Sequence, residues 1–345
     1  MKAAIFQAPG KIEVQEVSDP VIKNPDEAIV KVTHSCICGS DLWFYRGISP
    51  KEPGSRVGHE FMGVIEAVGS DVKTIKVGDL VIAPFVVSDG YCPECWAGET
   101  RFCRHGRMWG TGGYDAGQGE KVRVPLADGT LVVVPEKNLD DHMLQALLPL
   151  TDVLSTGHHA AVVAHVGEGS TVAVIGDGAV GLCAVAASKR LGASKIFLVS
   201  THKDRAKLGQ RFGATEIIAV RGPEAAKKIK KMTGDLGVDC ALECVGTADA
   251  WDIALQAVRI GGNIGFVGVP HNIPDISVSK LFSTNVGVKG SGASARHYIP
   301  ELMPDVLNGK LDVSAIFTEE LPLVDIAKGY KNMDERRQIK VLIKP

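Results

Sequence analysis

The sequence lacks an excess of charge of either sign. Its 345 residues include 38 lysines and arginines against 40 aspartates and glutamates, a formal net charge of −2 at pH 7. Without a surplus of positive charge, we expect no binding to nucleic acid or to an anionic membrane. Hydrophobic residues make up 45% and charged residues 23%, as in globular proteins, and the length predicts two domains.

We expect neither a targeting segment nor a membrane span. Residues 1–6 are followed at once by Gln7 and Pro9-Gly10, which leaves no room for the apolar centre of a signal peptide. The best candidate for a span, residues 172–187, contains Asp177 and several glycines, and its pattern fits a strand, a turn and a helix better. We therefore expect a soluble, cytoplasmic protein.

The eight cysteines are not distributed like a disulfide framework. Three of them, at positions 92, 95 and 103, fall within twelve residues. In a long intracellular chain, such clustering is more typical of a metal site.

The chain shows two patterns of predicted secondary structure, one in each half. Up to about residue 150, short strand-like runs are separated by glycine and proline, which predicts a β-rich, barrel-like domain. From residue 171, strands alternate with helices, which predicts a parallel sheet covered on both faces and an α/β fold class. Residues 338–343 form another strand-like run that could return to the first domain.

The clearest motif of the second region predicts a dinucleotide site. Residues 176–181 read Gly-Asp-Gly-Ala-Val-Gly and fit G-x-G-x-x-G, between a strand and a helix. Gly176 allows the tight turn, Gly178 lets a pyrophosphate approach the backbone amides, and Gly181 allows the helix to pack against the sheet. Ala179 and Val180 open the helix, whose exposed N-terminus attracts phosphate.

The end of the next strand discriminates between NAD and NADP. An NAD site needs a carboxylate there for the ribose 2′-hydroxyl, but residues 199–205 read Val-Ser-Thr-His-Lys-Asp-Arg. A serine can bond a 2′-phosphate, and basic neighbours could neutralise it, so we favour NADP. The candidate contacts are Ser200, Thr201, His202 and Arg205, with Lys203 nearby. Two alternatives stay open: the basic side chains only face solvent, or Asp204 is the acidic residue of an NAD site.

One dense group of residues predicts a closed, structural zinc site. Cys92 and Cys95 have the two-residue gap that lets both sulfurs bind one ion; Asp89 lies three residues earlier and Cys103 eight residues later. The alternatives are a redox pair or buried cysteines, and His105 is a spare ligand. A second, scattered group contains Cys38, His59-Glu60 and Asp152; its spacing alone is a weak indication.

Together these motifs resemble the zinc-dependent medium-chain dehydrogenase/reductase family over essentially the whole chain. The supporting motifs are Cys38-Gly39-Ser40-Asp41, Val57-Gly58-His59-Glu60, Val77-Gly78-Asp79, the cysteine group, residues 176–181 and Gly213-Ala214-Thr215. The resemblance implies a GroES-like catalytic domain over residues 1–152, with the structural zinc lobe at 89–103. A Rossmann domain would span residues 153–289, and residues 290–345 would return to the catalytic domain. The active site would lie in the cleft between the domains.

The resemblance also implies roles for individual residues. Cys38, His59 and Asp152 would be the catalytic zinc ligands, as in the branch with aspartate as third ligand, and Glu60 could approach the metal. Asp41 would orient His59, and Ser40 would pass on the substrate's proton. Contacts to the cofactor would come from Val245, Val267 and Lys340.

Three positions depart from the family pattern. Asp89 replaces the first of four cysteines, Ser200 replaces the acidic ribose partner, and Trp43 replaces a relay histidine, although an indole cannot carry protons at neutral pH. The neighbouring Phe44 and Tyr45, with Trp43, suggest an apolar pocket lining.

The implied function is reversible hydride transfer between an alcohol, or an aldehyde or ketone, and NADP(H). Two zinc ions per chain, a small-molecule substrate and a homodimer or homotetramer are expected. The alternatives are a zinc-free quinone-type reductase of the same superfamily and a non-catalytic nucleotide-binding protein with structural zinc only. Two, one or no zinc ions per chain would separate the three.

Overall fold

The chain folds into two compact units in the computed structural model, which describes residues 1–271, 273 and 275–345. Unit 1 comprises residues Met1–Asp152 and Ser294–Pro345, and unit 2 comprises Val153–Ala293. The return to unit 1 therefore begins at Ser294 rather than at residue 290. Among the described residues, no helix is both long and apolar enough to cross a membrane.

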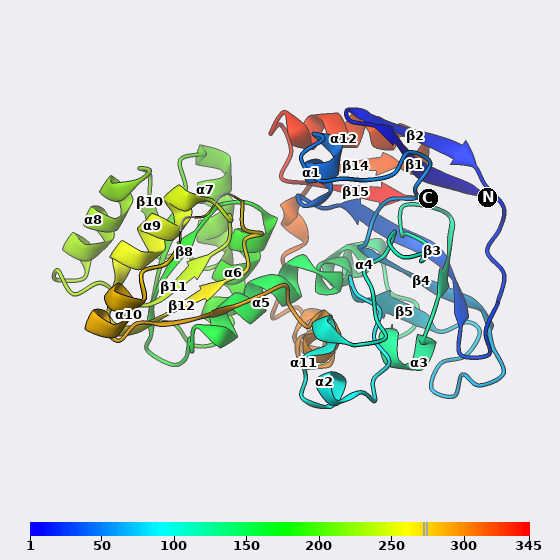
Figure 1. Ribbon diagram of the computed structural model, residues 1–345, viewed down its shortest axis with the longest axis horizontal. Coiled ribbons are helices and arrows are strands. Elements are labelled where there is room, and N and C mark those ends of the chain that lie inside the picture. Colours follow the sequence, from blue (N-terminus) through cyan, green and yellow to red (C-terminus); the bar gives the residue numbers. More distant parts are fainter. Residues whose placement is uncertain (272, 274) are drawn as a thin grey trace. The chain divides into compact units, whose positions relative to one another are not determined.

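Unit 1 is built on a mostly antiparallel sheet and a separate hairpin (Figure 1). The hairpin consists of β1 (Lys2–Ala8) and β2 (Lys11–Glu16). The sheet has the order β14-β15-β3-β4-β5-β7, and β6 also pairs with β3. Its strands are β3 (Ala28–Ile37), β4 (Phe61–Val68), β5 (Leu80–Ala83), β6 (Lys121–Val124), β7 (Val132–Val133), β14 (Phe317–Pro322) and β15 (Lys340–Lys344). Because β15 pairs antiparallel with β3, the C-terminal strand closes against the N-terminal part of the chain.

Helices and long loops of unit 1 surround this sheet. The helices are α1 (Asp41–Tyr45), α2 (Pro93–Trp96), α3 (Ala127–Thr130), α4 (Asp141–Leu147), α11 (Ala295–Leu307) and α12 (Ile326–Asp334). A 3₁₀ turn, η2 (Leu148–Thr151), leads to the unit boundary.

Unit 2 contains a six-stranded parallel sheet with the order β10-β9-β8-β11-β12-β13 among the residues described. The strands are β8 (Thr171–Ile175), β9 (Lys195–Val199), β10 (Glu216–Ile218), β11 (Val238–Glu243), β12 (Val258–Phe266) and β13 (Gly287–Gly290). This is the strand order of a Rossmann fold, and the chain reverses its winding between β8 and β11. The predicted α/β fold class is confirmed.

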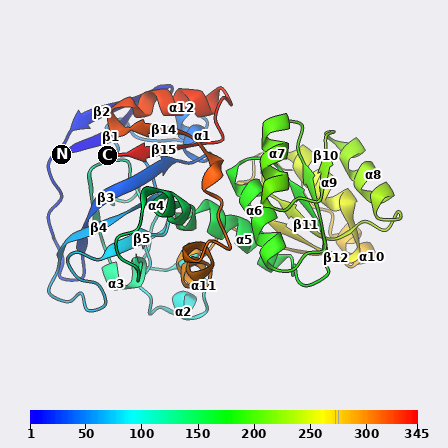
Figure 2. The same ribbon diagram turned by 180° about the vertical axis from the view of Figure 1, so that it is seen from behind.

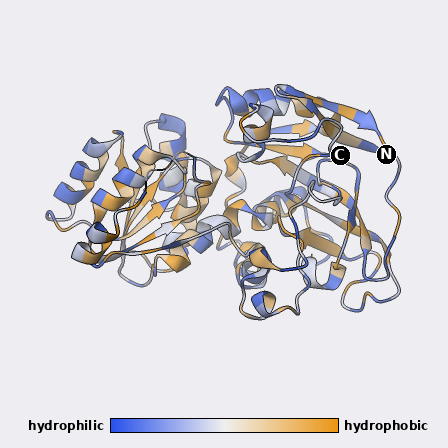
Figure 3. Ribbon diagram, viewed as in Figure 1, coloured by the Kyte–Doolittle hydropathy of each residue, from blue (hydrophilic) through white to orange (hydrophobic). Residues whose placement is uncertain are grey.

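Helices cover both faces of this sheet. One face carries α5 (Val153–Val163), α6 (Ala179–Arg190) and α7 (Lys203–Phe212), seen in front in Figure 2. The other carries α8 (Pro223–Met232) and α9 (Ala248–Ala257), with α10 (Val278–Thr284) beside β12. Because both faces are covered, the central strands are mainly apolar, and Figure 3 shows mostly hydrophobic strands beneath helices with hydrophilic outer faces.

Candidate functional site

The scattered ligand group of the sequence is assembled at one place in unit 1. Cys38 follows β3, and His59 and Glu60 precede β4, so the antiparallel pairing of these strands brings the three together. Asp152 is brought in by η2, because the Phe85 N–H donates to the Thr151 carbonyl at 2.9 Å. The ligand atoms of Cys38, His59, Glu60 and Asp152 all lie within 4.8 Å of one another.

The geometry of this group, which we call the Cys38 group, fits a metal ion. Cys38 Sγ lies 3.5 Å, and His59 Nε2 3.3 Å, from Asp152 Oδ2. The Oε2 atom of Glu60 is buried without a hydrogen-bond partner among the described residues. A thiol, an imidazole and carboxylates are zinc ligands, and a buried orphan oxygen is what a cation would satisfy.

The electrostatics of the Cys38 group also favour a cation. Burial raises the pKa of the Cys38 thiol, and the nearby Glu60 and Asp152 carboxylates raise it further. Burial by itself would lower the pKa of His59, but Asp41, Cys38 and Asp152 together raise it well above the ordinary value. In the absence of a metal ion, the negative charge around them keeps protons on Cys38 and His59, and a bound divalent cation would displace these protons.

A hydrogen-bonded scaffold behind His59 fixes its orientation. His59 Nδ1 lies 3.2 Å from Asp41 Oδ1, which leaves Nε2 facing the other ligands. Asp41 Oδ2 accepts from the Cys38 N–H at 3.1 Å and from Gln118 Nε2 at 3.3 Å. Tyr330 Oη in turn donates to Gln118 Oε1 at 2.9 Å. Such partners set the tautomer of a ligating histidine and strengthen metal binding.

Lys340, which the resemblance suggested as a cofactor contact, is buried beside the Cys38 group. Its side chain is 1% exposed, and its Nζ donates to Glu60 Oε1 at 2.6 Å and to the Ile37 carbonyl at 3.3 Å. Burial alone would lower its pKa, but Cys36, Glu60 and Cys38 raise it well above the ordinary value. The buried ammonium is thus paired with Glu60, beside the Cys38 group, and its predicted contact to the cofactor stays a prediction.

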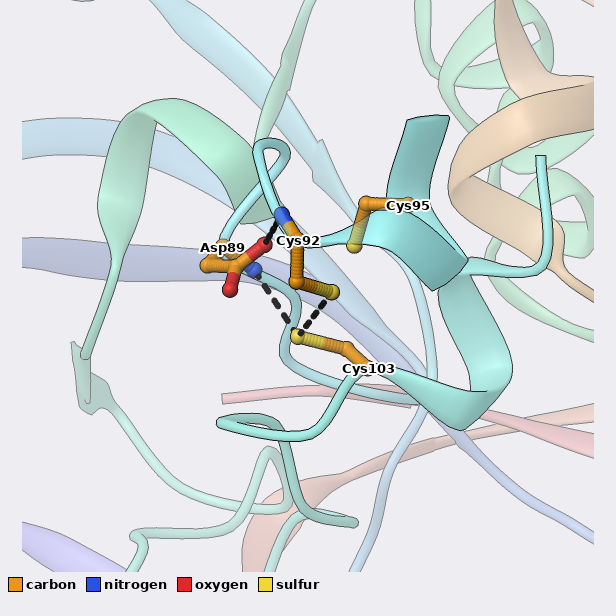
Figure 4. Close-up of side chains that lie close together, drawn as sticks. All are labelled: Asp89, Cys92, Cys95 and Cys103. Atoms are coloured by element: carbon orange, nitrogen blue, oxygen red, sulfur yellow. Dashed lines mark hydrogen bonds between the residues drawn. The ribbon is translucent and has the colours of Figure 1, made fainter. Parts of the chain in front are cut away.

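The second ligand group lies in the lobe between β5 and β6, where Figure 4 shows Asp89, Cys92, Cys95 and Cys103 turned toward one another. Their ligand atoms also lie within 4.8 Å of one another, with Cys92 Sγ 3.8 Å from Cys103 Sγ. Cys92 precedes α2, and the two-residue gap places Cys95 on the same turn. We call these four residues the cysteine lobe; three thiols and a carboxylate at these distances fit a closed zinc site.

Asp89 is the unusual member of the cysteine lobe, and its carboxylate is well anchored. Its Oδ1 accepts from the N–H groups of Tyr91 and Cys92 at 2.8 and 2.9 Å, and His105 Nδ1 lies 2.6 Å from Oδ2. Burial alone would raise the pKa of Asp89, but these hydrogen bonds lower it far below the ordinary value. Asp89 is therefore ionised, as a ligand must be, and His105 lies behind its carboxylate.

The glycine-rich turn of unit 2 leaves space for a pyrophosphate. At Gly176, φ is +116°, and a Cβ at Gly181 would lie 2.0 Å from the Gly176 carbonyl oxygen, so both positions require glycine. A Cβ at Gly178 would meet nothing within 4 Å and would fill the space in front of the turn. Gly178 is also the N-cap of α6 and supplies no side-chain cap, so the first amides of that helix, from Ala179 and Val180, are available to an anion.

A carboxylate that the sequence analysis missed lies beside this turn. Asp177 Oδ2 accepts from Ser200 Oγ at 2.7 Å and lies 2.8 Å from His202 Nδ1, while Arg205 Nη1 donates to Oδ1 at 3.3 Å. Burial alone would raise the pKa of Asp177, but His202, Ser200 and Arg205 lower it. Asp204, the acidic alternative, is exposed on the first turn of α7. The carboxylate next to Ser200 thus comes from the glycine-rich turn.

The remaining predicted residues lie at the ends of helices or strands of the two units. Ser40 is the half-buried N-cap of α1, two residues after Cys38. Val245 and Val267 follow β11 and β12, and a Cβ at Gly176 would lie 2.7 Å from Val245 Cγ2.

The suggested aromatic pocket lining needs correction for two residues. The ring centroids of Phe44 and Tyr45 lie 6.3 and 5.3 Å from that of Tyr330, and both rings are partly buried against the apolar core cluster that contains Tyr330. They are therefore packing residues, and only Trp43 keeps the assignment from the sequence.

Two family models match the chain. "Alcohol dehydrogenase GroES-like domain" matches residues 24–136 and "Zinc-binding dehydrogenase" matches residues 179–308. A "probable zinc-binding alcohol dehydrogenase" of Mycobacterium tuberculosis is 39% identical over 333 residues, which cover 96% of this chain and 84% of that protein.

Solved structures agree with these matches. An alcohol dehydrogenase from Thermus sp. ATN1 has a TM-score of 0.92 at 33% identity, covering 100% of this chain and 99% of that one. A zinc-binding dehydrogenase from Sinorhizobium meliloti, solved with NADP bound, has a TM-score of 0.84 at 26% identity, covering 100% and 99%. The chain therefore belongs to the zinc-dependent medium-chain dehydrogenase/reductase family, an oxidoreductase family that includes the zinc-type alcohol dehydrogenases.

Proposed function

We propose that this protein is a zinc-dependent alcohol dehydrogenase or carbonyl reductase that transfers hydride reversibly between a small alcohol, or an aldehyde or ketone, and NADP(H). The observation that carries the proposal is the convergence of Cys38, His59 and Asp152 with Glu60 behind them. A zinc-free reductase would have no use for four converging ligand atoms. The same residues support the family branch with aspartate as third ligand.

The residues of unit 1 hold the metal and prepare the site. When bound, zinc makes a hydroxyl oxygen easier to deprotonate or polarises a carbonyl, and the nicotinamide exchanges the hydride. Asp41 keeps His59 Nε2 toward the ligand group, and Lys340 holds Oε1 of Glu60, so that Glu60 keeps only Oε2 for the cation. Ser40, at the start of α1, is the residue we propose to accept the substrate's hydroxyl proton and pass it outward.

A second zinc ion would be held by Asp89, Cys92, Cys95 and Cys103 and would stabilise the lobe. His105, bonded to Asp89, would orient this carboxylate as outer partners of metal ligands do. Two zinc ions per chain are therefore proposed.

The preference for NADP is supported by charge at the carboxyl ends of β9 and β10. Arg221 donates to the Thr201 hydroxyl there and pairs with no carboxylate among the described residues, and no carboxylate follows β9 directly. This surplus of positive charge suits a 2′-phosphate better than a free hydroxyl.

The Cys38→Ser variant tests the proposed function. We expect turnover of alcohols or carbonyl compounds to be lost while NADPH binding, followed by cofactor fluorescence, stays within about twofold of the native protein, because Cys38 lies in unit 1 and the nucleotide turn in unit 2. Normal turnover in this variant would contradict the assignment of the Cys38 group as catalytic.

A further inference from the structure

The residues that contact Asp177 are poorly placed to bind the 2′-phosphate of NADP. Ser200, His202 and Arg205 already direct their polar atoms to its carboxylate. A phosphate taking their hydrogen bonds would have to displace Asp177 and would lie against its negative charge. The polar atoms of these three side chains, which we call the inner group, are thus already satisfied by the carboxylate of Asp177.

An outer pair of side chains has no such internal anion. Arg221 Nε and Nη2 both donate to the hydroxyl oxygen of Thr201, at 3.1 and 2.9 Å. Thr201 follows the end of β9, and Arg221 lies three residues after β10. The two strands are parallel neighbours with Ile218 paired to Val199, so their carboxyl ends open at the same edge of the sheet.

The donor count of this pair leaves room for a ligand. A guanidinium has five N–H donors, of which Thr201 takes two, and the Thr201 hydroxyl keeps its own hydrogen to donate. Within the described part of the chain, Arg221 forms no ion pair with a carboxylate, and both side chains are exposed. Arg221 is therefore a positive charge without a counter-ion, held in place by Thr201 at the edge where the adenosine ribose binds in this fold.

We propose that Arg221 and Thr201 bind the 2′-phosphate of NADP and that Arg221 sets the cofactor preference. The other candidate residues keep their hydrogen bonds to Asp177 and line the ribose pocket; they are Ser200, His202 and Arg205. This inference rests on the NADP preference proposed above. The guanidinium faces the phosphate with a pair of parallel donors, and the threonine hydroxyl adds a third.

The test is a fluorescence titration of the full-length protein with NADPH and with NADH. The variants are Arg221→Gln, Thr201→Val and the control Arg211→Gln. Arg211 is also an exposed arginine, but it lies in the last turn of α7, at the opposite edge of the sheet. A fourth variant, His202→Ala, probes the inner group.

Removing a charge-assisted contact to phosphate is expected to weaken NADPH binding by roughly 10–100-fold in Arg221→Gln and by less in Thr201→Val. NADH binding by both variants should change by less than about twofold, and Arg211→Gln should bind both cofactors as the native protein does. Loss of NADPH preference in His202→Ala but not in Arg221→Gln would overturn the inference and leave the proposed function standing. A native protein that prefers NADH would remove the NADP preference and the inference together.

Discussion

The buried ion pair of Lys340 and Glu60 gives the sharpest prediction for unit 1. The two side chains are 1% and 0% exposed, and Nζ lies 2.6 Å from Oε1. Replacing Lys340 by Met would leave the Glu60 carboxylate buried without its cation. Breaking a buried pair by removing one partner costs about 3–5 kcal/mol, so we expect the free energy of unfolding of zinc-free protein at pH 7 to fall by about that amount.

The assay is urea unfolding followed by circular dichroism. The control is Lys344→Met on the same strand, where the lysine is 32% exposed and pairs with the more exposed Asp141 and Glu320; here we expect a loss of less than about 1 kcal/mol. The double variant Glu60→Gln/Lys340→Met should recover part of the loss, because no charge is then stranded. A Lys340→Met protein with the stability of the native protein would refute this reasoning.

Three further predictions concern the other sites. Cys103→Ser should retain one zinc ion per chain instead of two and unfold at a lower temperature, whereas His105→Ala should retain both ions. Elemental analysis measures the zinc content, and loss of zinc from His105→Ala would show that His105 is itself a ligand. In urea unfolding, the free energy of unfolding of Gly58→Ala should be lower than that of Gly54→Ala by more than about 1 kcal/mol. Both glycines have positive φ, but only at Gly58 would a Cβ meet Gln118, at 2.4 Å. An equal loss of stability in the two variants would show that this clash has no cost. Asp177→Asn should be less stable than the native protein at pH 7, and this difference in stability should shrink below about pH 4. The reason is that a carboxyl group with a lowered pKa stabilises the fold only while it is ionised. A difference in stability that does not change with pH would exclude an ionised Asp177.

The parts of the fold that the sequence predicted are those that depend on local spacing. Residues 171–181 form strand β8, the turn and the start of α6 as expected, because the apolar run and the three glycines act within one segment. Cys92 and Cys95 likewise share a single turn. Patterns of this kind need no knowledge of what lies across the sheet.

The contacts that the sequence did not predict join distant segments. Lys340 and Glu60 are 280 residues apart and meet only because β15 pairs with β3, next to β4. Asp177 reaches Ser200 because β8 and β9 are neighbours, a strand order that no local pattern specifies. Phe44 and Tyr45 face Tyr330 of α12, which the sequence could not place beside α1.

The central claim is that the Cys38 group holds a zinc ion in addition to that of the cysteine lobe. The most direct measurement is the zinc content per chain of the native protein and of His59→Ala, by elemental analysis after dialysis. We predict two ions in the native protein and one in the variant, which should remain folded because its lobe is unchanged. Fewer than two ions in the native protein, or two in the variant, would contradict the account.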